Sequence, residues 1–393
     1  MTSESPKTVL SLNGGSSSLK FAAFAADRAE LRRLARGAVE RLGSSAGVLR
    51  LAVADEVSAR EARCDARDLR AVVATVFDAL SRSGIEFEAV GHRMVHGGPE
   101  HLEPERIDPR LMTSLREATL FAPLHLPGEL ALIEAVSARD PAMPQVACFD
   151  TAFHARMPDV ARRLALPSFL WEEGVRRYGF HGLSYESIVE ALGPAAAGRV
   201  VVAHLGNGAS AAALYDGEPR DTTMGLTPCG GLVMGTRSGD LDPGVVVYLI
   251  RSRALDADAL EELLNRESGL FALSETTSDM RALLDARSSD PRAGRAIDAF
   301  SYSARKWIGA LAAGLGGLDT LVFTGGIGER AASIREEICR DLRHLGIELD
   351  TVRNARSEPI VTADGSRTVV RVIPTNEELM IARHTARLIF TAA

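Results

Sequence analysis

Two segments of the chain carry residues that suit phosphate binding. Residues 8–20 and residues 200–214 each hold an apolar, β-branched run, a tight turn of Gly, Asn or Ser, and a second apolar run. A glycine-rich turn lets backbone N–H groups converge on an anion because no Cβ stands in the way. In a Rossmann unit or a P-loop such a turn opens a helix, whereas residues 20–24 and 210–214 continue as strands. Both turns are therefore predicted to lie in β-hairpins, and two such hairpins suggest two similar domains facing one nucleotide.

Two arginines lie in segments where they could bind an anion. Arg93 follows an apolar run and precedes Gly97 and Gly98, and its guanidinium fork could hold a small carboxylate or a phosphate. Taken alone, Arg93 is better explained as a solvated residue at a strand end. Arg237 lies among Thr, Ser and Gly before a predicted helix that begins at Pro243. Its small neighbours offer no packing surface and leave room for a phosphate.

Two histidines and an aspartate could also take part in chemistry. His181 lies between glycines after a basic pair, which favours close approach by a ligand over the usual structural role of a lone histidine. His125 lies in a turn bracketed by prolines, and either role fits it. Asp150 ends an apolar strand, where open α/β sheets place catalytic groups. Most aspartates after strands only begin turns, but the position of Asp150 at the expected domain junction favours a function.

Two segments in the second half of the chain have two explanations each. Glu377 lies at a helix start, where it is either an acid that stabilises the first turn or a hard oxygen ligand for Mg²⁺. Residues 324–329 form a glycine-rich turn between a strand and a helix, which alone proves little because such turns can be packing devices. Beside the polar residues 277–281, the same turn could hold a nucleoside.

The elements that position these residues alternate between strand and helix, which predicts an α/β fold. A boundary just after Asp150 gives domains over residues 1–150 and 151–379, and a C-terminal helix, about 380–393, is expected to complete the first domain. No low-complexity linker separates the halves, so a ligand cleft is expected between them. Predicted strands cover residues 9–13, 20–25, 89–95, 145–149, 200–205, 210–215, 319–324 and 369–373, and predicted helices cover residues 66–82, 128–138, 243–252, 293–315, 331–345 and 376–390.

The composition excludes several classes of protein. The 393 residues are 46% hydrophobic and 25% charged, with a net charge of −7, which argues against nucleic acid or an anionic membrane surface as a partner. The longest apolar run, residues 245–250, is too short to span a bilayer, and residues 1–7 hold no apolar signal core. The four cysteines have no paired or metal-type spacing. Reduced thiols and a cytoplasmic location are therefore expected.

Jointly and in this order, the motifs closely resemble those of the acetate kinase family, which belongs with sugar kinases and heat-shock ATPases in the actin superfamily. The resemblance covers the chain from about residue 8 to the last helix. The sequence departs from the family at Gly14, where Cys is frequent, at Leu126, where Asn is usual, and at Leu183 and Tyr185, where Thr and His are frequent. None of these departures removes a charged group. The motifs are residues 12–21, 92–98, 149–154, 178–182, 234–243 and 373–379.

The resemblance implies a fold and a reaction. The fold would be α/β, with two similar actin-like (ribonuclease H-like) domains, a nucleotide cleft between them, and a homodimeric assembly. The reaction would be reversible, Mg²⁺-dependent, in-line transfer of the γ-phosphoryl group of ATP to acetate, giving acetyl phosphate and ADP. The alternatives are a propionate or butyrate kinase of the same family, or a non-catalytic actin-like ATP-binding module. Such a module would have no use for Arg93, Arg237 and His181 at one phosphate.

The resemblance also implies a role for each motif residue. The catalytic residues would be Asp150, His181 and Arg237, with Asp150 orienting the metal or Arg93 rather than abstracting a proton. Mg²⁺ would be held by Asn13 and Glu377. The acid would be bound by Arg93, Val95, Leu124, His125, Phe180 and Pro228. The nucleotide would be bound by Lys20, His204, Leu205, Gly206, Asn207, Gly208, Asp279, Met280, Arg281, Gly325, Gly326, Ile327, Gly328 and Glu329.

Overall fold

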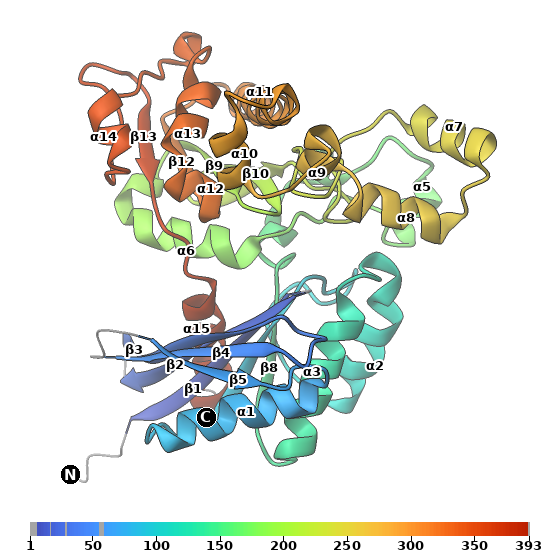
Figure 1. Cartoon of the computed structure of the whole chain (residues 1–393), viewed down its shortest axis with the longest axis vertical. Helices are drawn as coiled ribbons and strands as arrows, with labels where there is room; N and C mark the ends of the chain where they lie inside the picture. The colour runs from blue at the N-terminus through green and yellow to red at the C-terminus, as the bar shows by residue number, and fades with distance from the viewer. Residues whose placement is uncertain (1–5, 16, 28–29, 55–58, 392–393) are drawn as a thin grey trace. The chain divides into compact units, whose positions relative to one another are not determined.

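The computed structural model describes residues 6–15, 17–27, 30–54 and 59–391 (Figure 1). The chain forms two compact units: unit 1 is Met1–Phe153 with Asn376–Ala393, and unit 2 is His154–Thr375. Each unit has its own sheet, flanked by helices, so the predicted α/β class is confirmed. Ser16, in the first glycine-rich turn, and residues 1–5 of the N-terminal segment lie outside the described residues.

Unit 1 is built on an eight-stranded sheet with the order β5-β4-β3-β2-β1-β6-β8-β7. β1 to β5 pair antiparallel in succession, whereas β6 runs parallel to β1, and β8 runs parallel to β6. The carboxyl ends of β1, β6 and β8 therefore lie at the same edge of the sheet. Polar side chains at such strand ends can face a ligand. The strands are β1 (Lys7–Gly14), β2 (Ser18–Asp27), β3 (Glu30–Glu40), β4 (Gly47–Val53), β5 (Arg60–Cys64), β6 (Ala89–Met94), β7 (Glu105–Arg106) and β8 (Gln145–Phe149).

Helices cover both faces of this sheet because side chains alternate along β1. Leu10 and Leu12 pack with the buried residues of α1 and α3 on one face. Val9 packs with Ala382 of α15 on the other face, and Figure 1 shows α15 lying against the strands of unit 1. The C-terminal helix therefore lies within unit 1. The helices of unit 1 are α1 (Leu69–Arg82), α2 (Pro109–Glu117), η1 (Ala118–Phe121), α3 (Leu126–Arg139) and α15 (Glu377–Phe390).

Unit 2 repeats this plan with a five-stranded sheet in the order β11-β10-β9-β12-β13. β9, β10 and β11 pair antiparallel, and β12 runs parallel to both β9 and β13. The long helix α11 packs on β9 and β10. The strands are β9 (Arg199–Leu205), β10 (Ala209–Tyr215), β11 (Glu218–Thr222), β12 (Thr320–Thr324) and β13 (Val369–Val372).

Helices and irregular segments make up the rest of unit 2. None of the described helices of the chain is long and apolar enough to cross a lipid bilayer. The helices of this unit are η2 (Phe153–Arg156), α4 (Asp159–Arg162), α5 (Ser168–Glu172), α6 (Gly182–Leu192), η3 (Gly193–Ala196), α7 (Pro243–Arg253), α8 (Ala257–Arg266), α9 (Gly269–Ser274), α10 (Met280–Ala286), α11 (Pro291–Gly314), α12 (Gly325–Arg330), α13 (Ala332–Cys339), η4 (Arg343–Leu345) and α14 (Thr351–Ala355), with η2 beginning at the last residue of unit 1.

Both predicted hairpins are confirmed. β1 and β2 pair antiparallel up to Gly14 opposite Leu19, and β9 and β10 pair up to Leu205 opposite Ala209. The equivalent strands of the two units thus enter their glycine-rich turns in the same way. In each sheet the first strand of the hairpin also pairs with a parallel strand on its other side.

Two details of the sequence-based prediction are wrong. Residues 325–328 do not form a turn, because α12 begins at Gly325 directly after β12. Gly325 has φ +75°, and a Cβ there would lie 2.7 Å from the carbonyl oxygen of Leu205, so only glycine allows this junction. The helix predicted over 331–345 ends at Cys339, and a separate 3₁₀ turn follows at Arg343–Leu345.

The sequence analysis also missed β3, β4 and β5. β5 has no buried residue, and β3 buries only Ala35 and Val39 among its eleven residues. A register shift in β2 opposite β3 further breaks the alternation. β3 and β5 therefore lack the apolar period of two by which a strand is recognised, whereas β4 does bury alternate residues, among them Leu49 and Leu51, and was overlooked in the sequence.

The packing of α15 on β6 depends on a glycine. A Cβ at Gly91 would lie 2.2 Å from Thr385 Oγ1 and 2.6 Å from Ile381 Cγ2 of α15. We expect Gly91→Ala to cost about 1–3 kcal/mol through overpacking, which lowers Tm by roughly 3–9 °C. Gly128→Ala in α3 is the matched control, because its Cβ would meet no heavy atom within 4 Å. A Gly91→Ala protein as stable as the Gly128→Ala protein in thermal unfolding would contradict this packing.

Candidate active site

A buried ion pair lies at the carboxyl edge of the unit 1 sheet. Arg93, near the end of β6, donates from Nε to both oxygens of Asp150 at 3.1 Å and from Nη2 to Asp150 Oδ2. β6 and β8 are parallel neighbours, so the register brings these two residues together. The side chain of Asp150 is 1% exposed and that of Arg93 is 17% exposed. Burial opposes the charge of Arg93, but Asp150 and Glu377 outweigh it and raise the pKa of Arg93.

The two predicted metal-binding residues contact each other beside this pair. Asn13, near the end of β1, donates from Nδ2 to Glu377 Oε2 at 2.8 Å, and Arg93 Nη1 donates to Asn13 Oδ1 at 3.3 Å. Glu377 is the first residue of α15, the helix that packs on β1. The structure therefore brings Asn13, Arg93, Asp150 and Glu377 together, although Glu377 lies 364 residues from Asn13 in the chain. We call these four residues the unit 1 cluster.

The donor set of the unit 1 cluster suits a magnesium ion. Mg²⁺ prefers hard oxygen ligands and is usually held by one or two carboxylates together with substrate phosphates and water. Glu377 Oε1 and the carboxylate of Asp150 supply such oxygens. No group of three or more His, Cys, Asp or Glu side chains among the described residues forms a complete metal cage. The oxygens of the unit 1 cluster are of the kind that hold Mg²⁺ together with phosphates and water.

The other predicted residues of unit 1 lie near this edge of the sheet or on β2. Val95 follows β6 and is 3% exposed. Leu124 and His125 directly precede α3 and are half-buried. Lys20 lies opposite Asn13 in the β1–β2 hairpin and is exposed.

One residue of this region was missed by sequence reasoning. Glu129, in the first turn of α3, is 5% exposed, and its Oε2 accepts a hydrogen bond from the backbone N–H of Val95 at 2.9 Å. In the sequence Glu129 resembles any acid in the first turn of a helix. The signal that could have found it is its spacing of four from His125, the predicted acid-binding residue that directly precedes α3.

Unit 2 holds two stacked histidines. The rings of His181 and His204 lie 4.2 Å apart at 17°. Ser210 Oγ lies 2.8 Å from His181 Nδ1 and 2.5 Å from the hydroxyl of Tyr185. His181 has φ 60° at the start of α6, the left-handed conformation that non-glycine residues adopt at a cost. Tyr185, one of the departures from the family pattern, therefore helps to fix the ring of His181.

Arg237 meets His181 at a glycine of the second hairpin turn. A Cβ on Gly208 would lie 3.1 Å from Arg237 Nη2 and 3.2 Å from His181 Nε2. Arg237 Nη1 donates to the carbonyl of Pro228 at 2.6 Å, which holds the guanidinium in place. Two predicted catalytic residues and a predicted nucleotide-binding residue thus come together in unit 2. Phe180 is 1% exposed, and its carbonyl contacts His154 Nε2 at 3.1 Å.

The predicted nucleotide-binding segments of unit 2 are tied together by backbone contacts. In the hairpin turn, Gly206 N–H donates to Gly208 O at 3.0 Å, and Asn207 O accepts from Gly235 N–H at 2.8 Å. In α12, Glu329 Oε1 accepts from Gly325 N–H at 3.1 Å and from Thr375 N–H at 3.2 Å. The carboxylate of Glu329 therefore serves the shape of this segment.

Arg335 stabilises the end of α12 through hydrogen bonds. Its side chain is fully buried and donates to the carbonyls of Gly328, Glu329 and Asn354.

The third predicted nucleotide-binding segment, residues 279–281, also has a structural role. Asp279 caps α10 by accepting from Ala282 N–H at 2.8 Å, Met280 is 5% exposed, and Arg281 is exposed.

The chain matches a known family over almost its whole length. A family model described as the acetokinase family covers residues 8–383. This chain belongs to the acetokinase family. The resemblance stated from the motifs is therefore confirmed, and so is the prediction of a kinase that uses a carboxyl group as phosphoryl acceptor.

Individual relatives agree with this assignment. The chain is 51% identical over 307 residues to an acetate kinase of Rhodopseudomonas palustris (strain ATCC BAA-98 / CGA009), covering 76% of this chain and 77% of that protein. It is similar to the crystal structure of Porphyromonas gingivalis acetate kinase, with TM-score 0.85, 37% identity, and coverage of 98% and 100%. A propionate kinase from Francisella tularensis gives TM-score 0.91 at 35% identity, also over 98% and 100%. These likenesses confirm the two-domain, actin-like fold.

Proposed function

We propose that the enzyme transfers the γ-phosphoryl group of ATP to acetate, reversibly and in line, and that Arg93 binds the acid. Arg93 carries five N–H donors, and the contacts of the described residues use one on Nε, one on Nη1 and one on Nη2. The two that are left equal the number that a carboxylate takes in a bidentate pair. This arrangement of Arg93 is the observation on which the proposal rests. Acetate is already ionised near neutral pH, so Asp150 orients Arg93 and no general base is needed.

Arg237 and His181 are proposed to stabilise the phosphoryl group during transfer. A transferring phosphoryl group carries charge on its equatorial oxygens, and fixed N–H donors stabilise that charge. Nη2 of Arg237 and Nε2 of His181 both lie beside Gly208, and the missing side chain there leaves room for phosphate oxygens. The turn of His204 to Gly208, with Lys20, would contact the phosphates. Gly325 to Glu329 and Asp279 to Arg281 would hold the nucleoside.

Asn13 and Glu377 are proposed to hold Mg²⁺, directly or through water. When bound, the ion would offset the negative charge of the β- and γ-phosphates. Glu377 Oε2 is fixed by Asn13 Nδ2, so the carboxylate is already oriented without the ion. Residues 1–150 with the C-terminal helix, and residues 151–379, remain our prediction for the two functional domains.

Acetate is proposed as the preferred acid, with Val95, Leu124, His125, Phe180 and Pro228 around its methyl group. One similar structure is that of a propionate kinase, so the sibling activity is the alternative. The four apolar residues of this set, Val95, Leu124, Phe180 and Pro228, all have side chains larger than that of alanine. A pocket lined by larger side chains favours the smaller acid.

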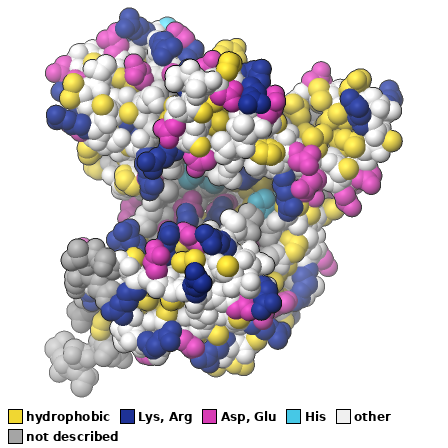
Figure 2. Space-filling view, viewed as in Figure 1, with side chains coloured by type: hydrophobic (Ala, Val, Ile, Leu, Met, Phe, Trp, Pro, Cys, Tyr) yellow, Lys and Arg dark blue, Asp and Glu magenta, His cyan; other side chains and the backbone are white. Residues whose placement is uncertain are grey.

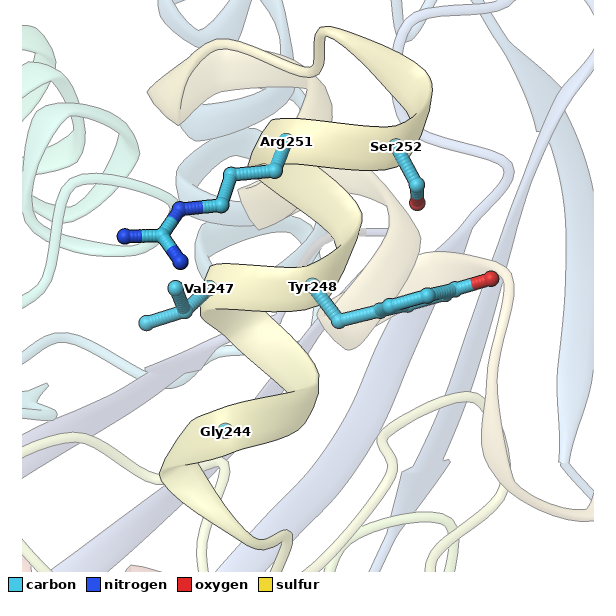
Figure 3. Close-up of a pocket in the computed structure, with 5 residues that line it drawn as sticks. All are labelled: Gly244, Val247, Tyr248, Arg251 and Ser252. Carbon is cyan, nitrogen blue, oxygen red and sulfur yellow. The ribbon is translucent and has the colours of Figure 1, made fainter.

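The assembly is proposed to be a homodimer formed through α7. This helix has no buried residue, although its middle is Val-Val-Val-Tyr-Leu-Ile. Figure 2 shows hydrophobic side chains at the surface in the part of unit 2 that holds α7, and Figure 3 shows Val247 and Tyr248 projecting from different sides of it. Soluble monomers rarely leave such a patch uncovered.

The charges at the ends of α7 favour a second copy of the chain as the partner. Asp240 and Asp242 lie at its start, and Arg251 and Arg253 lie in its last turn. Two copies of α7 packed antiparallel about a two-fold axis would place acids against bases and oppose the helix dipoles. We also propose a cytoplasmic location, because the four cysteines are scattered along the sequence without paired or metal-type spacing.

We expect Arg237→Ala to lower kcat by roughly 10³ or more while leaving nucleotide binding nearly intact, as for arginines that stabilise phosphoryl transition states. Coupled assays of ADP formation and a nucleotide-binding titration measure the two effects separately. Arg340→Ala is the matched control, because Arg340 is exposed, directly follows α13 and lies in none of the predicted motifs. A folded Arg237→Ala enzyme with wild-type kcat would overturn the assignment.

We expect Glu377→Ala to raise the Mg²⁺ concentration needed for half-maximal activity, because a hard oxygen ligand is lost. Glu377→Gln keeps an acceptor for Asn13 but removes the charge, and it should raise the requirement as well. If Glu377 only stabilises the first turn of α15, both variants will lose a little thermal stability and show the wild-type Mg²⁺ titration.

Acetate should be used better than propionate, and butyrate should be poor. One methylene in an apolar pocket is worth about 1–3 kcal/mol, so propionate is weakened rather than rejected. Val95→Ala should raise kcat/KM for propionate relative to acetate. Specificity constants for both acids decide the matter, and a wild-type enzyme that favours propionate would support the sibling activity.

We expect Tyr248→Glu to convert a dimer of about twice 42.0 kDa into a monomer, because a buried charge would replace an apolar contact. Tyr302→Glu is the matched control, since Tyr302 on α11 is 63% exposed and Tyr248 is 64% exposed. Light scattering after gel filtration measures both masses. A monomeric wild-type protein, or a Tyr248→Glu dimer, would disprove the α7 interface.

A further inference from the structure

A buried carboxyl group lies next to the unit 1 cluster and has no role in the reaction described above. Glu129 is 5% exposed. Its Oε2 accepts from Val95 N–H, and its Oε1 is buried and has no hydrogen-bond partner within the described part of the chain. An ionised carboxylate normally satisfies both oxygens, so a buried oxygen without a donor favours the neutral acid.

The charges that act on Glu129 come from two neighbouring strands. Arg93 of β6 attracts its negative form, and Asp150 after β8 repels it. Glu377 of α15 acts on the same Arg93. Two histidines lie close to these residues in the chain: His125 directly precedes α3, and His96 directly follows Val95. Burial is the largest influence and raises the pKa of Glu129 to about 8, although Arg93 and the Val95 N–H act to lower it.

We propose that Glu129 is a positioning residue of the acid-binding site: in its protonated form it holds the backbone of Val95 and leaves the charge of Arg93 for the substrate carboxylate, and loss of its proton weakens acid binding. This inference rests on the proposed role of Arg93. It assigns the enzyme an alkaline limit that comes from one side chain of α3 rather than from the reacting groups.

Ionised Glu129 weakens acetate binding because it adds to the number of carboxylates that surround Arg93. Asp150 and Glu377 already act on Arg93. Ionised Glu129 adds a third carboxylate to the same low-dielectric region, and acetate would then enter as a fourth anion. Arginine keeps its own charge throughout this pH range. The field that attracts acetate therefore falls when Glu129 ionises, whereas ATP binding in unit 2 has no such dependence.

The test is the KM for acetate at pH 7 and at pH 9, measured with saturating Mg-ATP. If acetate binds only to the enzyme with neutral Glu129, a pKa near 8 raises KM by about tenfold over this interval. Glu129→Gln stays neutral and should show no such rise. Glu134→Gln is the matched control, because Glu134 lies on the same helix with a side chain that is 53% exposed and paired to Arg116; it should behave as the wild type does.

Thermal unfolding gives a second measurement that does not depend on activity. The pKa of Glu129 in the folded chain, about 8, lies above its ordinary value of 4.5. Between pH 4.5 and pH 8 the folded state therefore binds more protons than the unfolded state. The stability from this group is full below about pH 4.5 and is lost as pH rises through about 8. The Tm of the wild type should therefore fall more between pH 6 and pH 9 than the Tm of Glu129→Gln.

An equal acetate KM at pH 7 and pH 9 in the wild type, or an equal rise in the wild type and Glu129→Gln, would overturn the inference. Neither result would touch the proposed function. That proposal fails separately, if Arg93→Ala leaves the acetate KM at pH 7 unchanged.

Discussion

The contact between Arg93 and Asp150 is the interaction on which the proposed acid-binding site depends. A buried carboxylate without a cation, or a buried guanidinium without an anion, would cost several kcal/mol, so each residue keeps the other charged. The pair exists because β6 and β8 are parallel neighbours that end at the same edge of the sheet. It also points the guanidinium: Asp150 takes Nε and one N–H of Nη2, Asn13 takes one of Nη1, and the donors that are left suit a second carboxylate.

The same plan of strands serves two different chemical tasks. In each unit an antiparallel hairpin begins the sheet, and parallel strands continue it from the first strand of that hairpin. In unit 1 the carboxyl edge carries Arg93, Asp150 and Glu377, which suit a carboxylate and a cation. In unit 2 the hairpin turn carries Gly208 between Arg237 and His181, which suits phosphate oxygens. Phosphoryl transfer to a carboxylate needs both sets, because two anions must approach each other.

The sequence predicts the α/β class, both hairpins and the family because these depend on local patterns: an apolar run, a glycine-rich turn and a second run. It does not predict β3 or β5, which bury few residues or none and lack an apolar period. Nor does it predict the helical start at Gly325, which depends on the nearby carbonyl of Leu205. The pairing of Asn13 with Glu377 could be predicted only through the family, since 364 residues separate them. Glu129 was missed because in the sequence it resembles any acid in the first turn of a helix, and only the structure shows that it is buried and bonded to Val95 N–H.

The role of the Arg93–Asp150 pair is tested most directly by the Michaelis constants of Asp150→Asn, with acyl phosphate trapped as the hydroxamate and thermal unfolding used to verify the fold. Asparagine keeps the size of the side chain but cannot hold the guanidinium through two charged oxygens. We expect the KM for acetate to rise by roughly tenfold or more, with the KM for ATP nearly unchanged, because the receptor for the acid is misdirected. A fall in kcat with an unchanged KM for acetate would contradict this role and make Asp150 part of the transfer step itself.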